Sequence, residues 1–348
     1  MNKMNVVEKT LIALVVAFMC LIVIIPLLFF VAVAFSNSIE VNSFPKSLFA
    51  STSVTVKIVP QDGGKYELLY DYGKGDGYES ILTSSKASNF ENHFRRQYGI
   101  EISGEKLMEE WEQTRENGPM EFTYKKTLFN NFKQFFKVVP NAASGLKNSI
   151  IVSIYTIIIS LVFGSLGGYA IARYRFKGRE QINVALLIVR MFPTVGISVS
   201  MAVLLIRMGL FDTMIGLALI YSVPNIALTS WITSSIFVGI SREMEEASLI
   251  FGANSLQTFK NITLPLAFPA MAASSMYSFL TAWNDTISAL ILTNKNQTLA
   301  LVVYKAIGST SSGIQYAAAG SIILILPALV FTFIIRKYIG QMWGGVKL

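Results

Sequence analysis

The chain is poor in the side chains that protein chemistry usually requires. It has one cysteine, one histidine and charged residues at only 14% of its 348 positions. The single cysteine, Cys20, excludes a disulfide framework, and its place in an apolar run predicts packing against lipid or other helices. His93 has no second metal ligand at a suitable spacing. The sequence also holds no G-x-x-x-x-G-K-[S/T] phosphate loop. We therefore expect no catalytic residue, metal site or cofactor in this chain.

Apolar residues dominate instead, at 53% of the chain. Soluble domains carry roughly a quarter charged residues, and a helix needs about 20 mainly apolar residues to cross a bilayer. Six runs meet this requirement, at residues 10–36, 147–172, 181–206, 213–238, 265–292 and 315–337. The first run is followed by no small-residue cleavage pattern, which favours an uncleaved signal anchor. The sequence predicts an all-α polytopic membrane protein with six transmembrane helices.

The net charge of +8 is not spread evenly. Residues 37–146 hold 13 Lys/Arg against 14 Asp/Glu, so the excess lies beside the apolar runs. The flanking residues are Lys3, Lys9, Arg173, Arg175, Lys177, Arg179, Arg336, Lys337 and Lys347. Short loops rich in Lys and Arg stay in the cytoplasm. This pattern predicts cytoplasmic termini and an external segment 37–146, and it gives no reason to expect nucleic acid binding.

The segment between the first two spans changes in character. Alternating apolar and polar residues at 51–72 predict a β-hairpin that turns at 62–64. Helical periodicity follows at 86–98, with Phe90, Phe94 and Tyr98 on one face, and again at 103–115. We therefore expect three parts: residues 1–36 with the first span, a small α+β extracytoplasmic domain at 37–121, and a core at 122–348. The run 122–140 is predicted to be an amphipathic lead-in to the second span.

A short polar segment, residues 239–264, separates the fourth and fifth spans. Its spaced pattern comprises Glu246, Ala247, Ser248, Gly252, Ile262, Leu264 and Pro265. Glycine permits a left-handed turn between two helices, and small residues before it let another surface approach the backbone. The glutamate can meet basic groups of a partner or complement a helix dipole. The last three residues would join the elbow rigidly to the next span. Such a segment is suited to being gripped by another protein.

This pattern resembles the cytoplasmic coupling loop of bacterial ABC importer permeases, which reads E-A-A, three residues, G, nine residues, I, one residue, L-P. Ser248 is the only departure. Three further strings resemble carbohydrate permeases of the maltose-importer type: residues 173–178, Trp283-Asn284-Asp285 and the tail 344–347. The resemblance implies a type I ABC importer permease fold in the bacterial inner membrane. It also implies a second permease, two ATP-binding subunits that hold ATP and Mg, an external solute-binding protein and a sugar or oligosaccharide substrate.

The candidate substrate pathway lies in the fifth span, which carries Ser278, Trp283, Asn284 and Asp285. A carboxylate inside a bilayer costs about 2.5–3.5 kcal/mol on insertion scales and so marks a functional position. Asp285 is either a substrate-cavity residue or one half of a structural pair, with Arg190 as a candidate partner. The external loop 293–314 either reaches toward a docked binding protein or simply re-enters the membrane.

Three alternative functions remain open from the sequence. An ABC permease for amino acids, polyamines or phosphonates would share the same coupling loop. A membrane-anchored assembly or sensor protein would act through residues 37–121 and would not need Glu246 or Gly252. A self-contained channel or secondary transporter would have no use for the spacing of the coupling pattern. The identity of the sugar, the identity of the second permease and the role of the inserted domain are left undetermined.

Overall fold

The computed structural model describes residues 6–43, 49–71, 77–308 and 313–342. The chain divides into two compact units, residues 1–140 with 305–323 and residues 141–304 with 324–348. We refer to them as the first and second units. The tail at 344–347, which carries part of the resemblance to carbohydrate permeases, lies outside the described residues.

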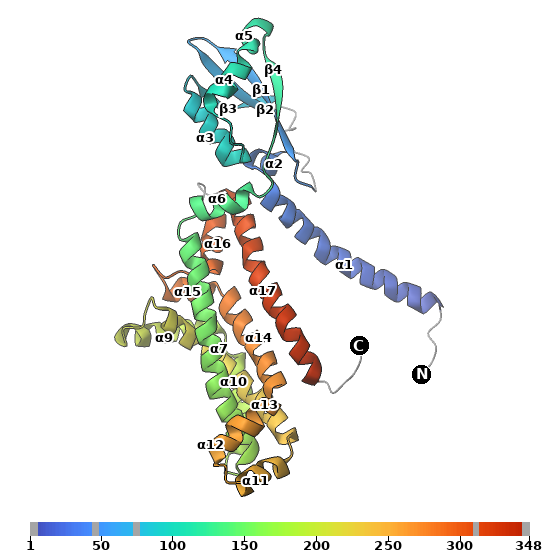
Figure 1. Ribbon diagram of the computed structural model, residues 1–348, viewed down its shortest axis with the longest axis vertical. Coiled ribbons are helices and arrows are strands. Elements are labelled where there is room, and N and C mark those ends of the chain that lie inside the picture. The colour runs from blue at the N-terminus through green and yellow to red at the C-terminus, as the bar shows by residue number, and fades with distance from the viewer. Residues whose placement is uncertain (1–5, 44–48, 72–76, 309–312, 343–348) are drawn as a thin grey trace. The chain divides into compact units, whose positions relative to one another are not determined.

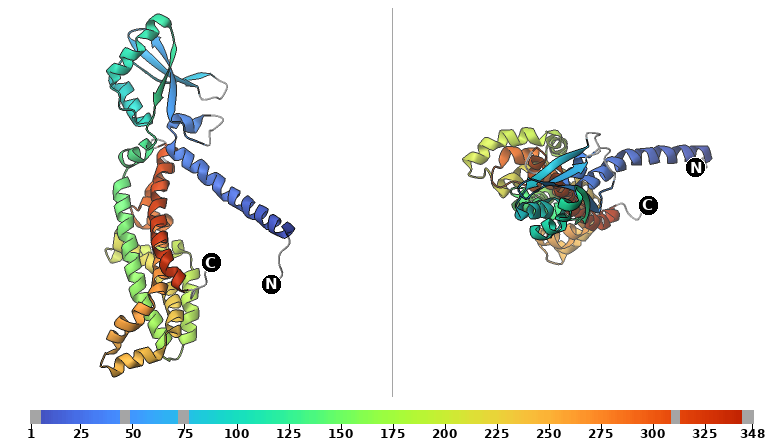
Figure 2. Two further views of the ribbon diagram at one scale, coloured as in Figure 1. Left: turned by 45° about the vertical axis from the view of Figure 1, so that its right-hand side comes forward. Right: turned by 90° about the horizontal axis from the view of Figure 1, so that it is seen from above.

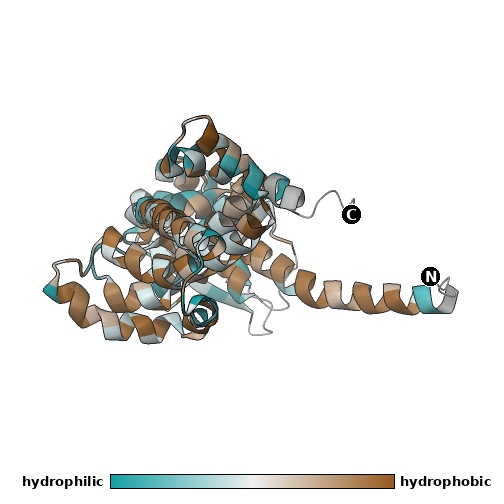
Figure 3. Ribbon diagram, turned by 90° about the horizontal axis from the view of Figure 1, so that it is seen from below, coloured by the Kyte–Doolittle hydropathy of each residue, from teal (hydrophilic) through white to brown (hydrophobic). Residues whose placement is uncertain are grey.

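The first unit begins with the long apolar helix α1 (Val6–Phe35). Figure 3 shows this helix mainly hydrophobic after a hydrophilic turn near the end marked N. The helix continues through Pro26, and Cys20 is exposed on it. Helix α2 (Ser38–Asn42) follows directly, and the Asn37 side chain caps it by accepting the backbone N–H of Glu40. The first predicted span is therefore a single uninterrupted helix.

A four-stranded antiparallel sheet follows, in the order β3-β2-β1-β4. The strands are β1 (Ser53–Gln61), β2 (Lys65–Asp71), β3 (Tyr78–Ser84) and β4 (Met120–Lys125). The predicted hairpin is confirmed, because β1 pairs with β2 across a turn in which Gly63 and Gly64 both have positive φ. Part of the predicted lead-in was wrong. Residues 120–125 form strand β4, since alternate residues Phe122 and Tyr124 point into the core of the domain.

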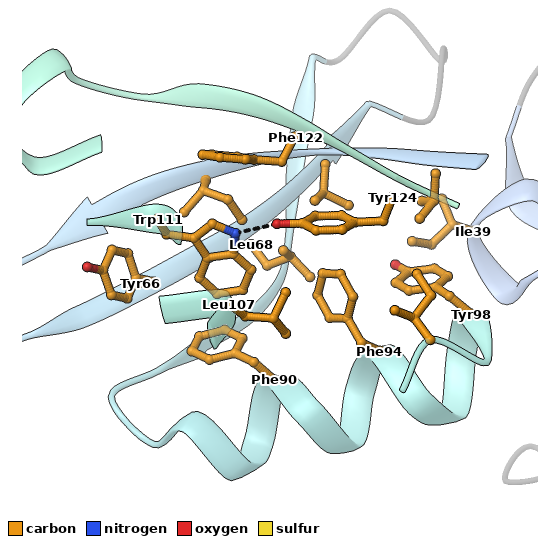
Figure 4. Close-up of a cluster of buried hydrophobic side chains, with 14 residues drawn as sticks. Ile39, Tyr66, Leu68, Phe90, Phe94, Tyr98, Leu107, Trp111, Phe122 and Tyr124 are labelled. Carbon is orange, nitrogen blue, oxygen red and sulfur yellow. Dashed lines mark hydrogen bonds between the residues drawn. The ribbon is translucent and has the colours of Figure 1, made fainter. Parts of the chain in front are cut away.

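Three helices pack on this sheet: α3 (Ala87–Tyr98), α4 (Gly104–Trp111) and α5 (Gln113–Asn117). Phe90, Phe94 and Tyr98 are buried, as their helical spacing predicts. Figure 4 shows Phe90 and Phe94 reaching from α3 toward the sheet, and the Trp111 indole N–H donating to the Tyr124 hydroxyl at 2.8 Å. Tyr98 also meets His93, whose pKa burial lowers to about 4, so this imidazole is neutral near pH 7.

A buried ion pair ties the end of α1 to this sheet. The Lys126 ammonium, 3% exposed, donates to both carboxylate oxygens of Glu40 at 2.7 Å and to the Phe35 carbonyl at 3.3 Å. Helix α6 (Asn130–Val138) adds a second link, because the Asn131 amide donates to the carbonyls of Ala34 and Ser36. The membrane helix and the inserted domain therefore share buried polar contacts at their junction.

The second unit is built on three helices that lie side by side, α7 (Ala142–Arg173), α10 (Met214–Gly239) and α14 (Phe268–Asn284), as Figures 1 and 2 show. Glycines set the spacing between the first two. A Cβ atom at Gly164 or Gly168 would lie only 2.5 Å from Thr229 or 2.1 Å from Thr233. These glycines thus allow α7 and α10 to approach closely.

Two predicted spans are interrupted. Helices α8 (Arg179–Met191) and α9 (Thr194–Arg207) meet at an angle of 93°, since Pro193 begins a new helix after the break. The run predicted as the fifth span, 265–292, is divided in the structure, because α14 ends at Asn284 and α15 (Ile287–Leu292) starts after Asp285. Helix α16 (Leu299–Ile307) occupies much of the predicted external loop, and α17 (Ile314–Met342) follows.

Four described helices are long and apolar enough to cross a membrane, or five if the bent α8–α9 pair counts as one span. They coincide with the predicted runs at 10–36, 147–172, 213–238 and 315–337, and the bent pair with 181–206. The fifth predicted run lacks a helix of that length because of its break at Asp285.

Candidate functional site

The segment that carries the spaced pattern folds as a helical elbow. Helix α11 (Arg242–Ile250) starts where the Ser241 side chain accepts the N–H of Glu243. The chain then turns at Gly252, whose φ of +90° is strained for any residue with a Cβ atom. Helix α12 (Ser255–Thr258), a π-helical turn (Phe259–Thr263) and the short α13 (Leu264–Leu266) lead toward α14. The predicted two-part elbow is confirmed.

The seven residues of the pattern differ in exposure. Glu246, Ala247, Gly252 and Pro265 are exposed, while Ser248, Ile262 and Leu264 are half-buried. The Ser248 hydroxyl lies 3.1 Å from the Thr258 hydroxyl and so links the two arms of the elbow. Leu264 packs against the cluster formed by Ala172, Phe237, Phe259 and Ala267. The half-buried members hold the elbow together, and the exposed ones are available to another molecule.

A buried ion pair that the sequence reasoning missed anchors this elbow. Glu245, one residue before Glu246, is buried and accepts from the Arg173 guanidinium at 2.8 and 3.0 Å. The Thr263 hydroxyl donates to the same carboxylate at 2.7 Å. Arg173 also donates to the Ile240 carbonyl at 3.2 Å. Residues from α7, α11 and the π-helical turn thus meet at one carboxylate. In the sequence Arg173 belongs to a positive flank and to the 173–178 string that resembles carbohydrate permeases, and neither feature identifies Glu245 as its partner.

A small cavity lies beside this ion pair. Its volume is about 200 Å³, and it is lined by Tyr169, Tyr174, Arg242 and Glu246 together with the buried pair. Glu246 therefore borders a polar cavity, while Glu245 is committed to its intramolecular partners.

An exposed apolar tip surrounds the glycine turn. Ile250 is 83% exposed, Phe251 90% and Leu256 71%. We call these three residues the apolar knuckle. Ile250 and Phe251 precede the turn at Gly252 and Leu256 follows it, so all three lie at the outer end of the elbow. The rest of this segment is rich in polar residues. Large apolar side chains with that exposure are typical of a protein interaction site.

Two of the proposed pathway residues are packed inside the second unit. Ser278 is fully buried, and Trp283 is 1% exposed. The Trp283 indole donates to the Leu324 carbonyl at 2.8 Å and stacks on Phe279, which in turn stacks on Phe331. This arrangement gives Trp283 a packing role between α14 and α17 and leaves it no direct access to a solute in this conformation.

The other two pathway residues lie at the break between α14 and α15. Asn284 is exposed, whereas Asp285 is half-buried and accepts the Ser288 backbone N–H at 3.0 Å. The buried Tyr221 hydroxyl lies near the carboxylate without making a hydrogen bond of normal geometry. Arg190 lies over the Tyr277 ring at 5.7 Å, and no ion pair to Asp285 occurs among the described residues. The pairing of Arg190 with Asp285 is therefore absent here.

A second carboxylate organises the turns at the opposite end of these helices. Asp212, in the turn between α9 and α10, accepts the backbone N–H groups of Asn294, Lys295 and Asn296 at 2.9–3.1 Å. The Asn296 amide returns a bond to the Asp212 carbonyl at 2.6 Å. Burial acts to raise the pKa of Asp212, but the three backbone donors outweigh it and hold the pKa below its ordinary value. The carboxylate thus fixes the start of the 293–314 loop.

Comparison with known proteins agrees with these features. Residues 160–343 match the family described as "Binding-protein-dependent transport system inner membrane component". The trehalose transport system permease protein SugB of Mycobacterium tuberculosis is 32% identical over 227 residues, which cover 63% of this chain and 82% of that protein. The trehalose/maltose transport system permease protein MalG of Thermococcus litoralis is 29% identical over 229 residues, covering 64% and 82%.

A solved structure shares the fold. It belongs to a bacterial ABC transporter involved in the import of the acidic polysaccharide alginate. The superposition has a TM-score of 0.60 at 17% sequence identity and covers 97% of this chain and 99% of the other. At that identity the likeness concerns the fold alone.

Proposed function

The chain belongs to the family of inner membrane components of binding-protein-dependent transport systems, and we propose that it is the permease subunit of an ATP-driven sugar importer. The observation that carries the proposal is the elbow itself. Its apolar knuckle is exposed, whereas its base is fixed to α7 by the buried Arg173–Glu245 pair. An elbow with a rigid base and an exposed apolar tip is suited to docking on a separate ATPase and to passing its movement into the helices.

The proposed cargo is a sugar or oligosaccharide. The two relatives described above are named as a trehalose permease and a trehalose/maltose permease, and the Trp283-Asn284-Asp285 string resembles that of carbohydrate permeases. Within that string, Asn284 and Asp285 are the residues that reach the surface. We propose that these two lie along the translocation path, and that Ser278 and Trp283 support the break from within.

The proposed assembly contains a second permease, two ATP-binding subunits and an external solute-binding protein. ATP and Mg would be held by the ATPase partners. Six transmembrane helices would complete the type I permease fold, with the α14–α15 segment as the fifth. The chain would then have three functional parts: residues 1–36, the α+β insertion at 37–121 and the core at 122–348. Both termini would lie in the cytoplasm of a bacterium and the insertion outside its inner membrane.

The proposed mechanism is alternating access. ATP-driven closure of the partner subunits would move the elbow, and the buried Arg173–Glu245–Thr263 contacts would transmit that movement to α7 and α14. The cavity between the two permeases would then open to one side of the membrane at a time. Membership in a transport family argues against the sensor and self-contained channel alternatives. The remaining alternative is an importer of a non-sugar solute, and transport measurements distinguish it from a sugar importer.

The test is ATP hydrolysis and sugar uptake by the purified complex. The tagged chain is isolated from its native membrane, its co-purifying subunits are identified, and hydrolysis is measured with and without the solute-binding protein. We expect Phe251→Asp to abolish the stimulated hydrolysis by placing a charge in the apolar contact. Phe251→Leu, which keeps the contact apolar, retains most of it.

The outcomes separate the alternatives. A complex that contains an ATPase and a second permease and takes up a labelled disaccharide supports the proposal. If the complex took up an amino acid or a polyamine and did not respond to any sugar, the proposed sugar substrate would be wrong and the chain would belong to an importer of a non-sugar solute. A chain that purifies without an ATPase, or one whose activity is indifferent to Phe251→Asp, would contradict the coupling role of the elbow.

A further inference from the structure

The first unit contains a basic cleft for which the permease function gives no role. Its volume is about 620 Å³, and it lies between α6, the end of β4 and the loop after α3. Four basic residues and one acid line it: Arg95, Lys125, Lys133, Lys137 and Glu101. Among the described residues, Lys133 pairs with Glu101 at 3.9 Å, and Arg95 pairs with Glu91 at 3.8 Å. Lys125 and Lys137 form no ion pair with any described residue. This uncompensated positive charge fits an anionic group.

A second cavity in the same unit has the opposite chemistry. It measures about 490 Å³ and is walled by the last part of α1, with Ile25, Leu28, Val31 and Phe35, and by Leu128 from the segment before α6. Every lining residue is apolar. We call it the apolar groove. Its chemistry fits a hydrocarbon chain and offers nothing to a charged or hydroxylated ligand.

The basic cleft and the apolar groove share a wall. Phe129 lines the cleft, and Phe35 and Leu128 line the groove. The rings of Phe35 and Phe129 pack edge to face with their centroids 5.6 Å apart. A ligand that filled both cavities would therefore carry its anionic part on one side of this aromatic pair and its apolar part on the other.

Both cavities lie where a membrane surface is expected. Helix α1 is long and apolar enough to cross a membrane, and its side chains are exposed from residue 8 to residue 29. The groove begins on the last turns of that helix, at the point where the apolar run ends. The exposed face of α6 combines Phe129, Lys133, Phe136 and Lys137, at helical spacings of four, three and one residues. Aromatic and lysine side chains together on one face are typical of a helix at the lipid headgroup level.

We propose that the first unit binds one anionic phospholipid, with the phosphate in the basic cleft and an acyl chain in the apolar groove. An acidic oligosaccharide would match the cleft but leave the groove empty, and an apolar helix of another subunit would match only the groove. A phospholipid is the membrane component that carries both chemistries in one molecule. The inference rests on the membrane location of α1 and not on the identity of the transported solute.

Lipid retention measures this site directly. The full transport complex is reconstituted in nanodiscs of phosphatidylcholine with a minor fraction of phosphatidylglycerol, and bound lipid is counted by native mass spectrometry. We expect selective retention of phosphatidylglycerol. Replacing Lys133 and Lys137 by Gln should weaken it about five-fold for each lysine. Lys106→Gln, an exposed lysine on α4 outside the cleft, serves as the matched control and should leave it unchanged.

The groove is tested separately. Val31→Trp fills part of the apolar wall on a partly exposed position, and we expect it to reduce retention of phosphatidylglycerol with all lysines intact. Unchanged amide hydrogen exchange at the buried residues Phe90, Phe94 and Trp111 confirms that the inserted domain of each variant remains folded.

Three results would overturn the proposal. Equal retention of phosphatidylcholine and phosphatidylglycerol by the wild type would remove the charge selectivity. Competition by soluble glycerol phosphate as strong as by the lipid would show a headgroup site without an acyl chain. Displacement of the lipid by a uronic acid oligosaccharide would assign the cleft to an acidic sugar. None of these measurements requires transport, so failure of the lipid site and failure of the sugar importer assignment are distinguishable.

Discussion

Two neighbouring glutamates of α11 have separate environments. The Glu245 carboxylate is buried with Arg173 and Thr263, whereas Glu246 is exposed beside a polar cavity. Consecutive residues on a helix point about 100° apart, so one can anchor the elbow while the next faces a partner. We therefore infer that Glu245 stabilises the elbow, and we propose that Glu246 contacts the ATPase.

Glu245→Gln should loosen the elbow, because it leaves the Arg173 charge buried without an anionic partner. Breaking a buried pair in this way costs about 3–5 kcal/mol. Hydrogen exchange of residues 242–264 should accelerate accordingly. Glu246→Gln should change this exchange little, since substitutions of surface residues change stability by no more than about 0.5 kcal/mol. The same variant should nevertheless reduce coupled ATP hydrolysis.

The double variant Arg173→Met, Glu245→Leu is the control for that explanation. If the unpaired Arg173 charge destabilises the elbow, removing both charges should restore much of the protection of residues 242–264 from hydrogen exchange. Equal exchange in the Glu245→Gln and Glu246→Gln variants would show that the buried pair does not hold the elbow.

Gly252→Ala should strain the turn, because its φ of +90° suits only glycine. A Cβ atom at this position has no neighbour within 4 Å, so the cost is backbone strain alone, about 1–2 kcal/mol. Gly239→Ala at the end of α10 also meets no neighbour, and its φ is ordinary, so it is the matched control. We expect stimulated ATP hydrolysis to fall in the first variant only. A fall in both would point to the loss of glycine flexibility in general.

At the scale of elements, Asp212 joins two turns that are far apart in the chain. Its carboxylate accepts three backbone N–H groups from residues 294–296, and these groups precede helix α16, whose first five residues are buried. The Asn148 amide and the Ser149 hydroxyl of α7 add bonds to Gln297 and Leu299. The predicted external loop is thus anchored at its start, and a role in reaching a binding protein would fall on later residues.

Asp212→Asn should release this anchor while tolerating the positive φ of 56°, which asparagine adopts readily. Hydrogen bonds to a charged acceptor contribute about 1.5–3 kcal/mol each. We expect amide exchange at residues 294–296 to rise about 30-fold, which corresponds to a loss of about 2 kcal/mol. An unchanged exchange rate would contradict the role of the carboxylate.

The pH dependence follows from the lowered pKa of Asp212. A carboxyl group with a lower pKa in the folded state stabilises the fold above its unfolded pKa of 3.8, and this contribution is lost as the pH falls through the folded value. Protection at residues 294–296, corrected for intrinsic exchange, should therefore be constant between about pH 5 and pH 8. A decline within that window would assign the anchor to another group.

At the scale of the whole molecule, the orientation in the membrane is open to a direct test. In a Cys20→Ser background, single cysteines replace Lys106 in the inserted domain and Ser255 in the elbow, both of which are exposed. An impermeant maleimide should label position 106 in intact spheroplasts and position 255 only after permeabilisation. The opposite pattern would invert the proposed topology and remove the elbow from a cytoplasmic ATPase.

Features encoded in consecutive residues could be predicted from the sequence. Apolar runs predicted α1, α7, α10 and α17, because length and hydropathy are properties of a local segment. The glycine turn at 252 and the face of Phe90, Phe94 and Tyr98 followed from spacing along the chain. The coupling pattern was recognisable for the same reason.

Only the tertiary structure decided which residues meet. Arg173 and Glu245 are 72 positions apart, and Asp212 lies 82–84 positions from its donors. The burial of Trp283 depends on α17, and the basic cleft draws on α3, β4 and α6. Hydropathy and periodicity describe each segment by itself, whereas ion pairs, caps and cavities depend on the distance between segments after folding. The sequence by itself therefore determined the spans and the coupling pattern, and the fold selected Glu245 as the anchor, Asp285 as the break and the two cavities beside α1 and α6.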